Sequence, residues 1–324
     1  MAALRGEPVD RVPISFWGHH YTAENSASGL AEETVRQARH FEWDFLKPQS
    51  RAQCFAEMWG LTYTPATAMD QRFTVTHVPV NGAADFERLE SADWRSGALG
   101  EQLQALRSIR TKVGPDVPII WTVFSPLMVT RYLVPRGADH VLEIARAYPA
   151  ALEHALEAIT QTLIGYARAC LDSGADGIFY ATNMATRGLL VPEECRRFQR
   201  PYDLRVLEAV AAAPFNVMHV CGPAAFFDEF ADYPVSAFSW AMSPDNPSLS
   251  EGHRRTGKAA MGGIPAALKN LRPEEVTARA EAAIREMHGR WLLLAPDCSV
   301  DLTTPDALLL AAREATRTTS FGPA

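Results

Sequence analysis

The sequence predicts an α/β protein, specifically a (β/α)8 barrel of the TIM type. Eight short apolar runs are separated by helical segments along the 324 residues. Most of these runs do not alternate between polar and apolar residues, which is typical of parallel strands covered on both faces. Polar and reactive side chains directly follow several of the runs. That is the expected pattern where barrel strands end at an active site.

The expected elements follow the chain in order. Strands are predicted at 11–17, 44–47, 117–124, 177–181, 215–222, 237–240, 258–261 and 291–295. Helices are predicted at 32–41, 101–113, 138–172, 192–211, 273–288 and 305–317, with Pro149 breaking the third. The fifth helix shows the clearest end signals, with Pro273 and glutamates in its first turn and Gly289 after its last.

One domain is predicted to cover residues 1–324. No linker, low-complexity tract or internal repeat divides the sequence. Barrels of this class often exceed 250 residues as a single unit. The segment at 62–99, which includes a candidate strand at 73–80, is predicted to be an insertion after the second strand.

The composition restricts the class of protein. Hydrophobic residues make up 47% and charged residues 21%, an ordinary balance for a globular chain with a large core. The net charge of −7, without long basic runs, disfavours nucleic-acid binding. No apolar stretch approaches the roughly 20 residues of a membrane span, and the first residues lack the apolar run of a secretory signal. We therefore expect a soluble, cytoplasmic protein with no membrane partner, whose five cysteines are reduced.

The fifth strand and the eighth strand carry the residues that suggest chemistry. His219 and Cys221 stand two positions apart in Met218-His-Val-Cys-Gly222, so in an extended strand they point to the same side. Cys298 follows the eighth strand, and barrel geometry places it at the same end. One imidazole and two thiolates form a natural set of zinc ligands. Three protein ligands leave a fourth position open, as in catalytic sites.

Burial in the core is the competing explanation for these residues. Free cysteine is among the most buried residue types, so a His-x-Cys pair in a strand usually has no metal. The position of Cys298 at the mouth of another strand favours zinc. Cys54, Cys170 and Cys195 lie in helical sequence and are predicted to be structural.

Further polar and aromatic residues are expected at the same end of the barrel. Asp245, in the loop after the sixth strand, is the candidate for a fourth metal ligand, although loop carboxylates are more often solvated. The candidates for substrate binding are His19, His20, Gln49, Tyr180, Asn183, Trp240 and Asp297.

Nearly the whole chain resembles the uroporphyrinogen decarboxylase superfamily. The resemblance rests on Arg-Val-Pro-Ile at 11–14, Asp-Phe-Leu-Lys at 44–47, and the segments 125–132, 174–178, 192–198, 261–265 and 304–306. It implies a (β/α)8 barrel. True decarboxylases of the family carry an arginine-rich loop after the first strand and an aspartate after the second. Here these loops read Gly18-His-His-Tyr21 and Pro48-Gln-Ser-Arg51.

Within the superfamily, the His-x-Cys pattern followed by a distant cysteine resembles the corrinoid-linked methyltransferases, such as those that methylate coenzyme M. The resemblance implies zinc bound by His219, Cys221 and Cys298, with the metal holding a thiol as the thiolate that accepts a methyl group. No corrinoid-binding module is visible in this chain. The partner is therefore expected to be a corrinoid protein or free methylcobalamin, together with a small-molecule methyl acceptor or donor.

Two other interpretations stay open. The first is a decarboxylase acting on a porphyrinogen or another carboxylic acid, which predicts activity without metal. A porphyrinogen needs paired cations for its many carboxylates, and the missing arginines make it the poorer fit. The second is a barrel that has lost catalysis and serves as a binding protein, which predicts neither metal nor turnover.

Overall fold

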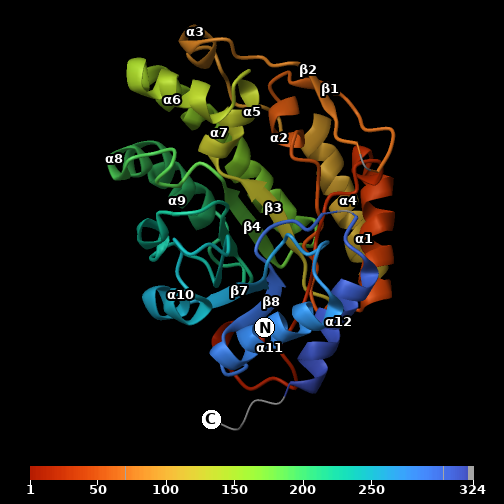
Figure 1. Cartoon of the computed structure of the whole chain (residues 1–324). Coiled ribbons are helices and arrows are strands. Elements are labelled where there is room, and N and C mark those ends of the chain that lie inside the picture. The colour runs from red at the N-terminus through yellow and green to blue at the C-terminus, as the bar shows by residue number, and fades with distance from the viewer. Residues whose placement is uncertain (70, 302, 320–324) are drawn as a thin grey trace.

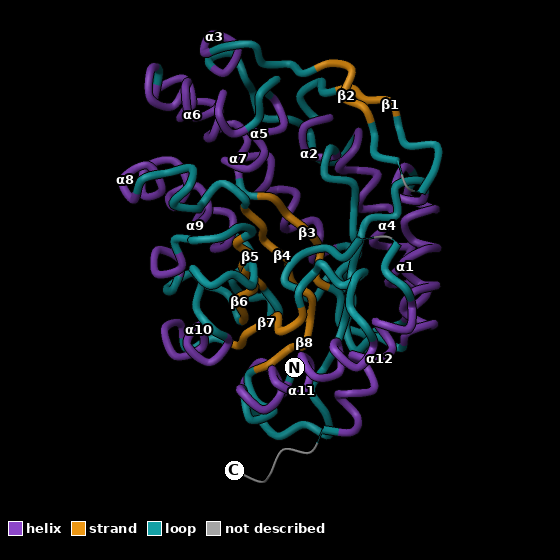
Figure 2. The backbone as a smooth tube through the Cα atoms, in the orientation of Figure 1, coloured by secondary structure: helices purple, strands orange, loops and turns teal. Residues whose placement is uncertain are grey.

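Six parallel strands form the central sheet of the protein. The computed structural model describes residues 1–69, 71–301 and 303–319. The strands β3 to β8 pair in sequence order, and all the pairings are parallel. Figure 2 shows them at the centre with helices around them. Their bounds are Ile120–Phe124 (β3), Gly177–Thr182 (β4), Val217–Val220 (β5), Ala237–Trp240 (β6), Ala259–Ile264 (β7) and Leu292–Pro296 (β8).

Two extended segments near the N-terminus close this sheet into a barrel. Leu294 in β8 donates its N–H to the Pro13 carbonyl at 2.8 Å, and Asp44 donates to the Ile14 carbonyl at 3.0 Å. On the other side, Ile120 in β3 donates to the Leu46 carbonyl at 2.9 Å. The predicted (β/α)8 barrel is thereby confirmed.

The first two predicted strands pair more briefly than expected. Each contacts its neighbour through isolated bridges, Ile14 with Leu294 and Leu46 with Ile119, rather than through a ladder. Prolines at 13, 48 and 118 explain this difference, because a proline has no N–H to donate to a neighbouring strand.

An ion pair fixes the two closing segments to each other. The Asp44 carboxylate accepts two hydrogen bonds from the Arg11 guanidinium and one from the Ile14 N–H. Bidentate arginine–carboxylate pairs are among the stronger hydrogen-bonded contacts. The motif residues at 11 and 44 therefore have a structural role at the N-terminal side of the barrel.

Helices cover the outside of the barrel (Figure 1). The predicted helices are all present, and the break at Pro149 separates α6 from α7. Four further helices among the described residues lie outside the predicted ranges: the short α2 and α3, and α5 and α10, which begin at the serine caps Ser125 and Ser248. The helices are Ala27–Phe41 (α1), Cys54–Glu57 (α2), Ala83–Phe86 (α3), Gly97–Val113 (α4), Pro126–Leu133 (α5), Ala138–Ala147 (α6), Pro149–Asp172 (α7), Pro192–Glu194 (α8), Arg200–Glu208 (α9), Leu249–Thr256 (α10), Pro273–Glu286 (α11) and Asp306–Thr318 (α12).

The segment at 62–99 contains a small hairpin apart from the main sheet. Strand β1, Thr62–Thr64, pairs antiparallel with β2, Thr74–His77, which lies inside the strand predicted at 73–80. Figure 1 shows this hairpin and α3 at the edge of the molecule, away from β3 to β8.

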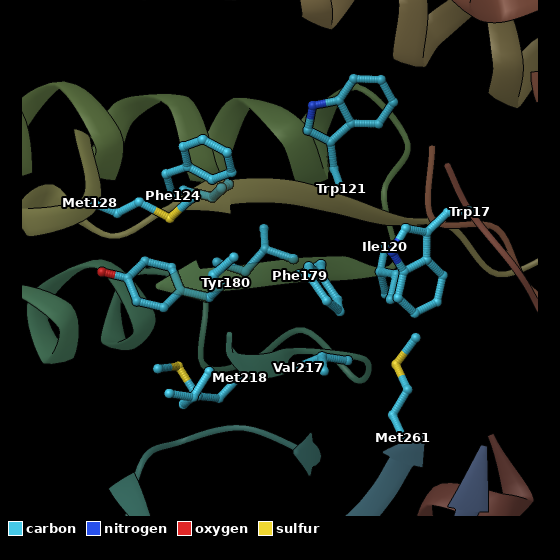
Figure 3. Close-up of a cluster of buried hydrophobic side chains, with 14 of the residues drawn as sticks. Trp17, Ile120, Trp121, Phe124, Met128, Phe179, Tyr180, Val217, Met218 and Met261 are labelled. Atoms are coloured by element: carbon cyan, nitrogen blue, oxygen red, sulfur yellow. The ribbon is translucent and has the colours of Figure 1, made fainter. Parts of the chain in front are cut away.

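Large apolar side chains fill the barrel and the layer beneath the helices. Trp121, Met218 and Met261 are completely buried on three different strands. Figure 3 shows them in one cluster with Trp17 and Phe179. Among the described residues, no helix combines the length and apolar character that a bilayer crossing requires.

The start of β4 passes so close to the start of β5 that only glycine fits. A Cβ atom on Gly177 would lie 2.1 Å from the carbonyl oxygen of Phe215.

Gly177→Ala is therefore expected to lower the free energy of unfolding by about 1 to 3 kcal/mol, the usual cost of overpacking. Urea denaturation measures this change. In the control Gly188→Ala the added methyl meets only Thr186 Oγ1, at 4.0 Å. An equal loss in both variants would contradict this close approach.

Candidate metal centre

Strand β5 and the residue that follows it present the first two candidate ligands. His219 lies in β5, and Cys221 follows directly, with its N–H donated to the Thr182 carbonyl at 2.9 Å. Gly222 then takes a φ of +116°, a conformation that few other residues adopt, and this ends the strand. The extended backbone between 219 and 221 sends both side chains to the same side, as the spacing predicted.

The third candidate ligand comes from the end of β8. Asp297 donates its N–H to the Ile264 carbonyl at 2.8 Å, which holds the chain beside β7 until Cys298. The Sγ atoms of Cys221 and Cys298 lie 3.7 Å apart. The candidate ligand atoms of His219, Cys221 and Cys298 all lie within 4.8 Å of one another, and this is the one such group in residues 1–69, 71–301 and 303–319.

These separations fit a tetrahedral metal. Two sulfurs bound tetrahedrally to zinc at about 2.3 Å lie roughly 3.8 Å apart. The observed 3.7 Å between the Sγ atoms agrees with that value. The three side chains therefore need little movement to hold one zinc ion, which leaves a fourth position for a small molecule.

The imidazole of His219 is fixed by two neighbours. Its Nδ1 lies 3.0 Å from Ser239 Oγ, and its ring stacks on Phe179 with centroids 4.9 Å apart. A hydrogen bond at one ring nitrogen sets the orientation of the other, a common arrangement for histidine ligands. Nε2 is therefore the nitrogen left to bind a metal.

The two thiols are unequal in charge. The Cys298 sulfur accepts hydrogen bonds from Cys221 and from His219, and these outweigh burial and lower the pKa of Cys298. The same contact with Cys298, together with burial, raises the pKa of Cys221. One thiolate is thus already stabilised without metal, and it is the form that binds a cation.

A cavity of about 180 Å³ lies directly against these three residues. An apolar cavity of roughly 150 Å³ holds a molecule the size of benzene, so the ligand that fits here is small. Its walls include Trp17, Phe124, Met128, Tyr132 and Phe179 as well as polar side chains. A wider groove of about 820 Å³, here called the vestibule, shares His19, Ala52, Tyr132 and Ser299 with the cavity.

Comparison with known proteins places the chain in a family. The family model for uroporphyrinogen decarboxylase (URO-D) matches residues 1–319. The chain belongs to the URO-D family. This confirms the resemblance inferred from the sequence motifs.

Relatives of this URO-D family chain carry two different names. A methylcobamide:CoM methyltransferase (MtaA) of Methanosarcina barkeri is 26% identical, over 94% of this chain and 92% of its own length. A uroporphyrinogen decarboxylase of Hydrogenovibrio crunogenus is 24% identical, over 65% of this chain and 64% of its own length. The solved structure of a methyltransferase from Methanosarcina mazei is 24% identical, covers 97% of this chain and 96% of its own, and has a TM-score of 0.83, which shows the shared fold.

Three of the substrate-binding candidates line the cavity of this URO-D family chain. His19, Gln49 and Asn183 contribute to its wall. The Oδ1 atom of Asn183 is buried with no hydrogen-bond partner among the described residues, and the same holds for Thr122 Oγ1 in the same cavity. Unpaired buried polar atoms are costly, and a bound ligand or water relieves that cost.

Tyr180 and Trp240, two of the substrate-binding candidates, point away from the cavity. The Tyr180 hydroxyl donates to Asp203 Oδ1 at 2.6 Å, and the Trp240 indole donates to the Pro247 carbonyl at 2.9 Å. Figure 3 shows Tyr180 directed to a different side of β4 from its neighbour Phe179. Successive residues of a strand face opposite sides, and the cavity is on the side of Phe179.

His20, Asp245 and Asp297 also lie outside the wall of the cavity. His20 Nδ1 accepts from the Ala23 N–H at 3.2 Å and lies outside the cavity wall. Asp245 is exposed and is absent from the described group of candidate metal ligands. The Asp297 carboxylate accepts from the Met242 and Ala266 N–H groups, so it joins two loops beside Cys298.

Lys47 is the cavity residue that sequence reasoning missed. It follows the second apolar run, where it counted only as part of the Asp-Phe-Leu-Lys family motif. Its side chain is buried in the cavity wall, and desolvation lowers the pKa of its ammonium group to about 7. A charged side chain at the end of a buried strand was the signal that could have identified it.

The role assigned here to Tyr180 can be tested by removing its hydroxyl. Tyr180→Phe is expected to lower the free energy of unfolding by roughly 1 to 3 kcal/mol, because a buried carboxylate loses a donor. Metal content is expected to stay the same. Thermal or urea unfolding and metal analysis measure these effects, with the exposed Tyr148→Phe as a matched control. A lower metal content with an unchanged free energy of unfolding would instead support a role of Tyr180 in the metal site.

Asp203 makes stability depend on pH. Burial raises its pKa to about 7, despite hydrogen bonds from Tyr180, Gln199 and Tyr233 that act in the opposite direction. Between about pH 4 and pH 7 the folded chain keeps a proton that the unfolded chain has lost, so this group reduces stability as pH rises. Asp203→Asn is expected to gain stability relative to wild type across that range. Urea unfolding at several pH values tests this, and parallel profiles would contradict it.

Proposed function

We propose that this URO-D family member is a zinc-dependent methyltransferase that moves a methyl group between a corrinoid and a small thiol. The observation that carries the proposal is the cluster of His219, Cys221 and Cys298 against a small cavity at the C-terminal ends of the barrel strands. Relatives of similar length bear the name methylcobamide:CoM methyltransferase.

The donor set supports zinc rather than a harder cation. Two thiols and an imidazole match zinc, whereas magnesium and calcium take oxygen ligands. Zinc bound to a thiol lowers the pKa of that thiol, which makes it a thiolate nucleophile at neutral pH. The chain itself sets the ligands: Ser239 and Phe179 orient His219, and the close contact of the two sulfurs favours a thiolate at Cys298.

The two spaces at the barrel mouth suit two partners of different size. The cavity of about 180 Å³ takes a small thiol, and its aromatic walls exclude water from the reacting sulfur. The vestibule of about 820 Å³ is open to solvent and adjoins the cavity, so it suits the approach of a corrinoid, free or held by a partner protein.

Decarboxylation of a porphyrinogen is the rival function, and the described part of the site disfavours it. No arginine lines the cavity within residues 1–69, 71–301 and 303–319, and Lys47 is its one lysine. A substrate with many carboxylates needs several paired cations. A tetrapyrrole also exceeds a cavity that matches a benzene-sized molecule.

Metal analysis tests the proposed site. Purified wild-type protein is expected to hold about one zinc per chain, as follows from a single three-ligand site. Cys221→Ala is expected to lose most of it, because two ligands bind zinc much more weakly than three. Cys195→Ala, a buried cysteine outside the group, is the matched control and is expected to keep the metal.

Activity separates the three interpretations. Wild-type protein mixed with methylcobalamin and a small thiol is expected to demethylate the corrinoid. The visible absorbance of the corrinoid measures the rate of this reaction. The rate is expected to be much lower with Cys298→Ser. Equal zinc in wild type and Cys221→Ala would contradict the site. Zinc-independent release of CO₂ from a porphyrinogen would favour the decarboxylase, and a protein with neither metal nor turnover would be a binding protein.

A further inference from the structure

Asn246 is a half-buried residue in the loop after β6, and its amide group bonds only to backbone atoms of other segments. Its Nδ2 donates to the Gly222 carbonyl at 3.0 Å and to the Ala241 carbonyl at 2.8 Å. Its Oδ1 accepts from the Ala225 N–H at 2.9 Å. A side-chain amide has two N–H donors, so both are used. One side chain thus joins the end of β6 to the loop that directly follows Cys221.

The loop that Asn246 holds has an unusual backbone. Gly222, the neighbour of Cys221, has a φ of +116°, and Ala224 has a φ of +49°, which a residue with a side chain rarely adopts. Such a conformation persists only where the surrounding contacts impose it. The Ala224 carbonyl accepts from the Arg187 N–H at 2.9 Å, and Asn246 supplies the contacts on either side of this residue. Without them the loop would relax, and Cys221 lies at its start.

The end of β6 is also bonded to the segment that carries the other candidate thiol ligand. The Asp297 carboxylate, next to Cys298, accepts from the Met242 N–H at 2.8 Å. Met242 directly follows Ala241, whose carbonyl accepts from Asn246. The end of β6 is therefore held by one side chain from each direction. Together these contacts connect the loops of the two thiols, whose Sγ atoms lie 3.7 Å apart.

We propose that Asn246 is a positioning residue for the candidate metal centre. By fixing the loop after β5, it holds Cys221 Sγ at the distance from Cys298 Sγ that a single metal ion requires. The inference rests on the proposed function for the metal, and it adds a residue that lies outside the cavity wall. Residues that orient metal ligands from outside the ligand set typically change metal affinity by roughly 10- to 100-fold when they are replaced.

Cobalt(II) tests the proposal, because it accepts the same kinds of ligands as zinc and its visible spectrum depends on their geometry. Asn246→Ala is expected to bind cobalt(II) about tenfold more weakly than wild type, the lower end of the usual range, because it acts through the backbone. Its visible absorption bands are expected to shift. Asn246→Asp keeps the acceptor for the Ala225 N–H but has no donor for the two carbonyls, so the same changes are expected. Titration followed by visible absorbance measures affinity and spectrum together.

Asn216 provides a matched control at the start of β5, the end of the strand away from the thiols. Its Oδ1 accepts from the Ile178 N–H at 3.0 Å, and its Nδ2 donates to the Val210 carbonyl at 2.8 Å. Asn216→Ala is expected to lower the thermal unfolding temperature at least as much as Asn246→Ala, because Asn216 is buried. Its cobalt affinity and spectrum are expected to match wild type. Wild-type values in Asn246→Ala would overturn the proposal, and so would an equal change in Asn216→Ala, since lost stability would then explain both.

Phenylarsine oxide, which binds two neighbouring thiols at once, separates this inference from the proposed function. Cys221 and Cys298 are partly exposed, whereas the other three cysteines are buried. Metal-free Asn246→Ala is expected to bind the arsenical more weakly than wild type and Asn216→Ala, as measured by mass spectrometry. If this difference is found in a protein that binds neither zinc nor cobalt, the positioning role stands and the proposed function is wrong. If zinc and methyl transfer are found but Asn246→Ala matches wild type, the proposed function stands and the role of Asn246 is wrong.

Discussion

The candidate metal centre depends on the closure of the parallel barrel. Cys221 and Cys298 are 77 positions apart in the chain, and two strands, β6 and β7, lie between β5 and β8 in the sheet. A flat sheet would hold their ends well apart, because neighbouring strands are about 4.8 Å from each other. The Sγ atoms meet at 3.7 Å because the sheet curves and the segments around Ile14 and Leu46 complete the ring. The Arg11–Asp44 pair at the opposite side therefore also supports the site.

Charge balance connects the metal ligands to the rest of the cavity. If zinc binds as proposed, its charge together with two thiolates and a neutral imidazole sums to zero, and a bound thiolate would then leave one negative charge in the cavity. Lys47 is the one lysine in the described wall of the cavity, and its Nζ lies over the ring faces of Trp17 and Phe179. Phe179 also stacks on His219, so one side chain supports both the cation and the ligand imidazole.

Strand periodicity explains which sequence predictions succeeded. The order of the barrel strands and the approach of His219, Cys221 and Cys298 followed from apolar runs and from a spacing of two. Tyr180 and Trp240 do not line the cavity, because their position at the end of a strand does not by itself set the side to which they point. In the register of the sheet, Ala181 pairs with His219 and His219 with Ser239, so these residues share the inner side. Tyr180 and Trp240 pair with Met218 and Val220 on the other side.

The contacts made by side chains in loops do not follow from the periodicity of strands. Asp297 was a candidate because it adjoins Cys298, yet its carboxylate is used by two backbone N–H groups from the loops after β6 and β7. Asp245 was a candidate because it follows β6, but its loop carries it into solvent. Lys47 was overlooked because nothing in the sequence around a single lysine indicates that its side chain is buried. A long cationic side chain usually reaches water, and only the folded chain shows that Trp17, Phe179 and Gln49 enclose this one beside the metal ligands.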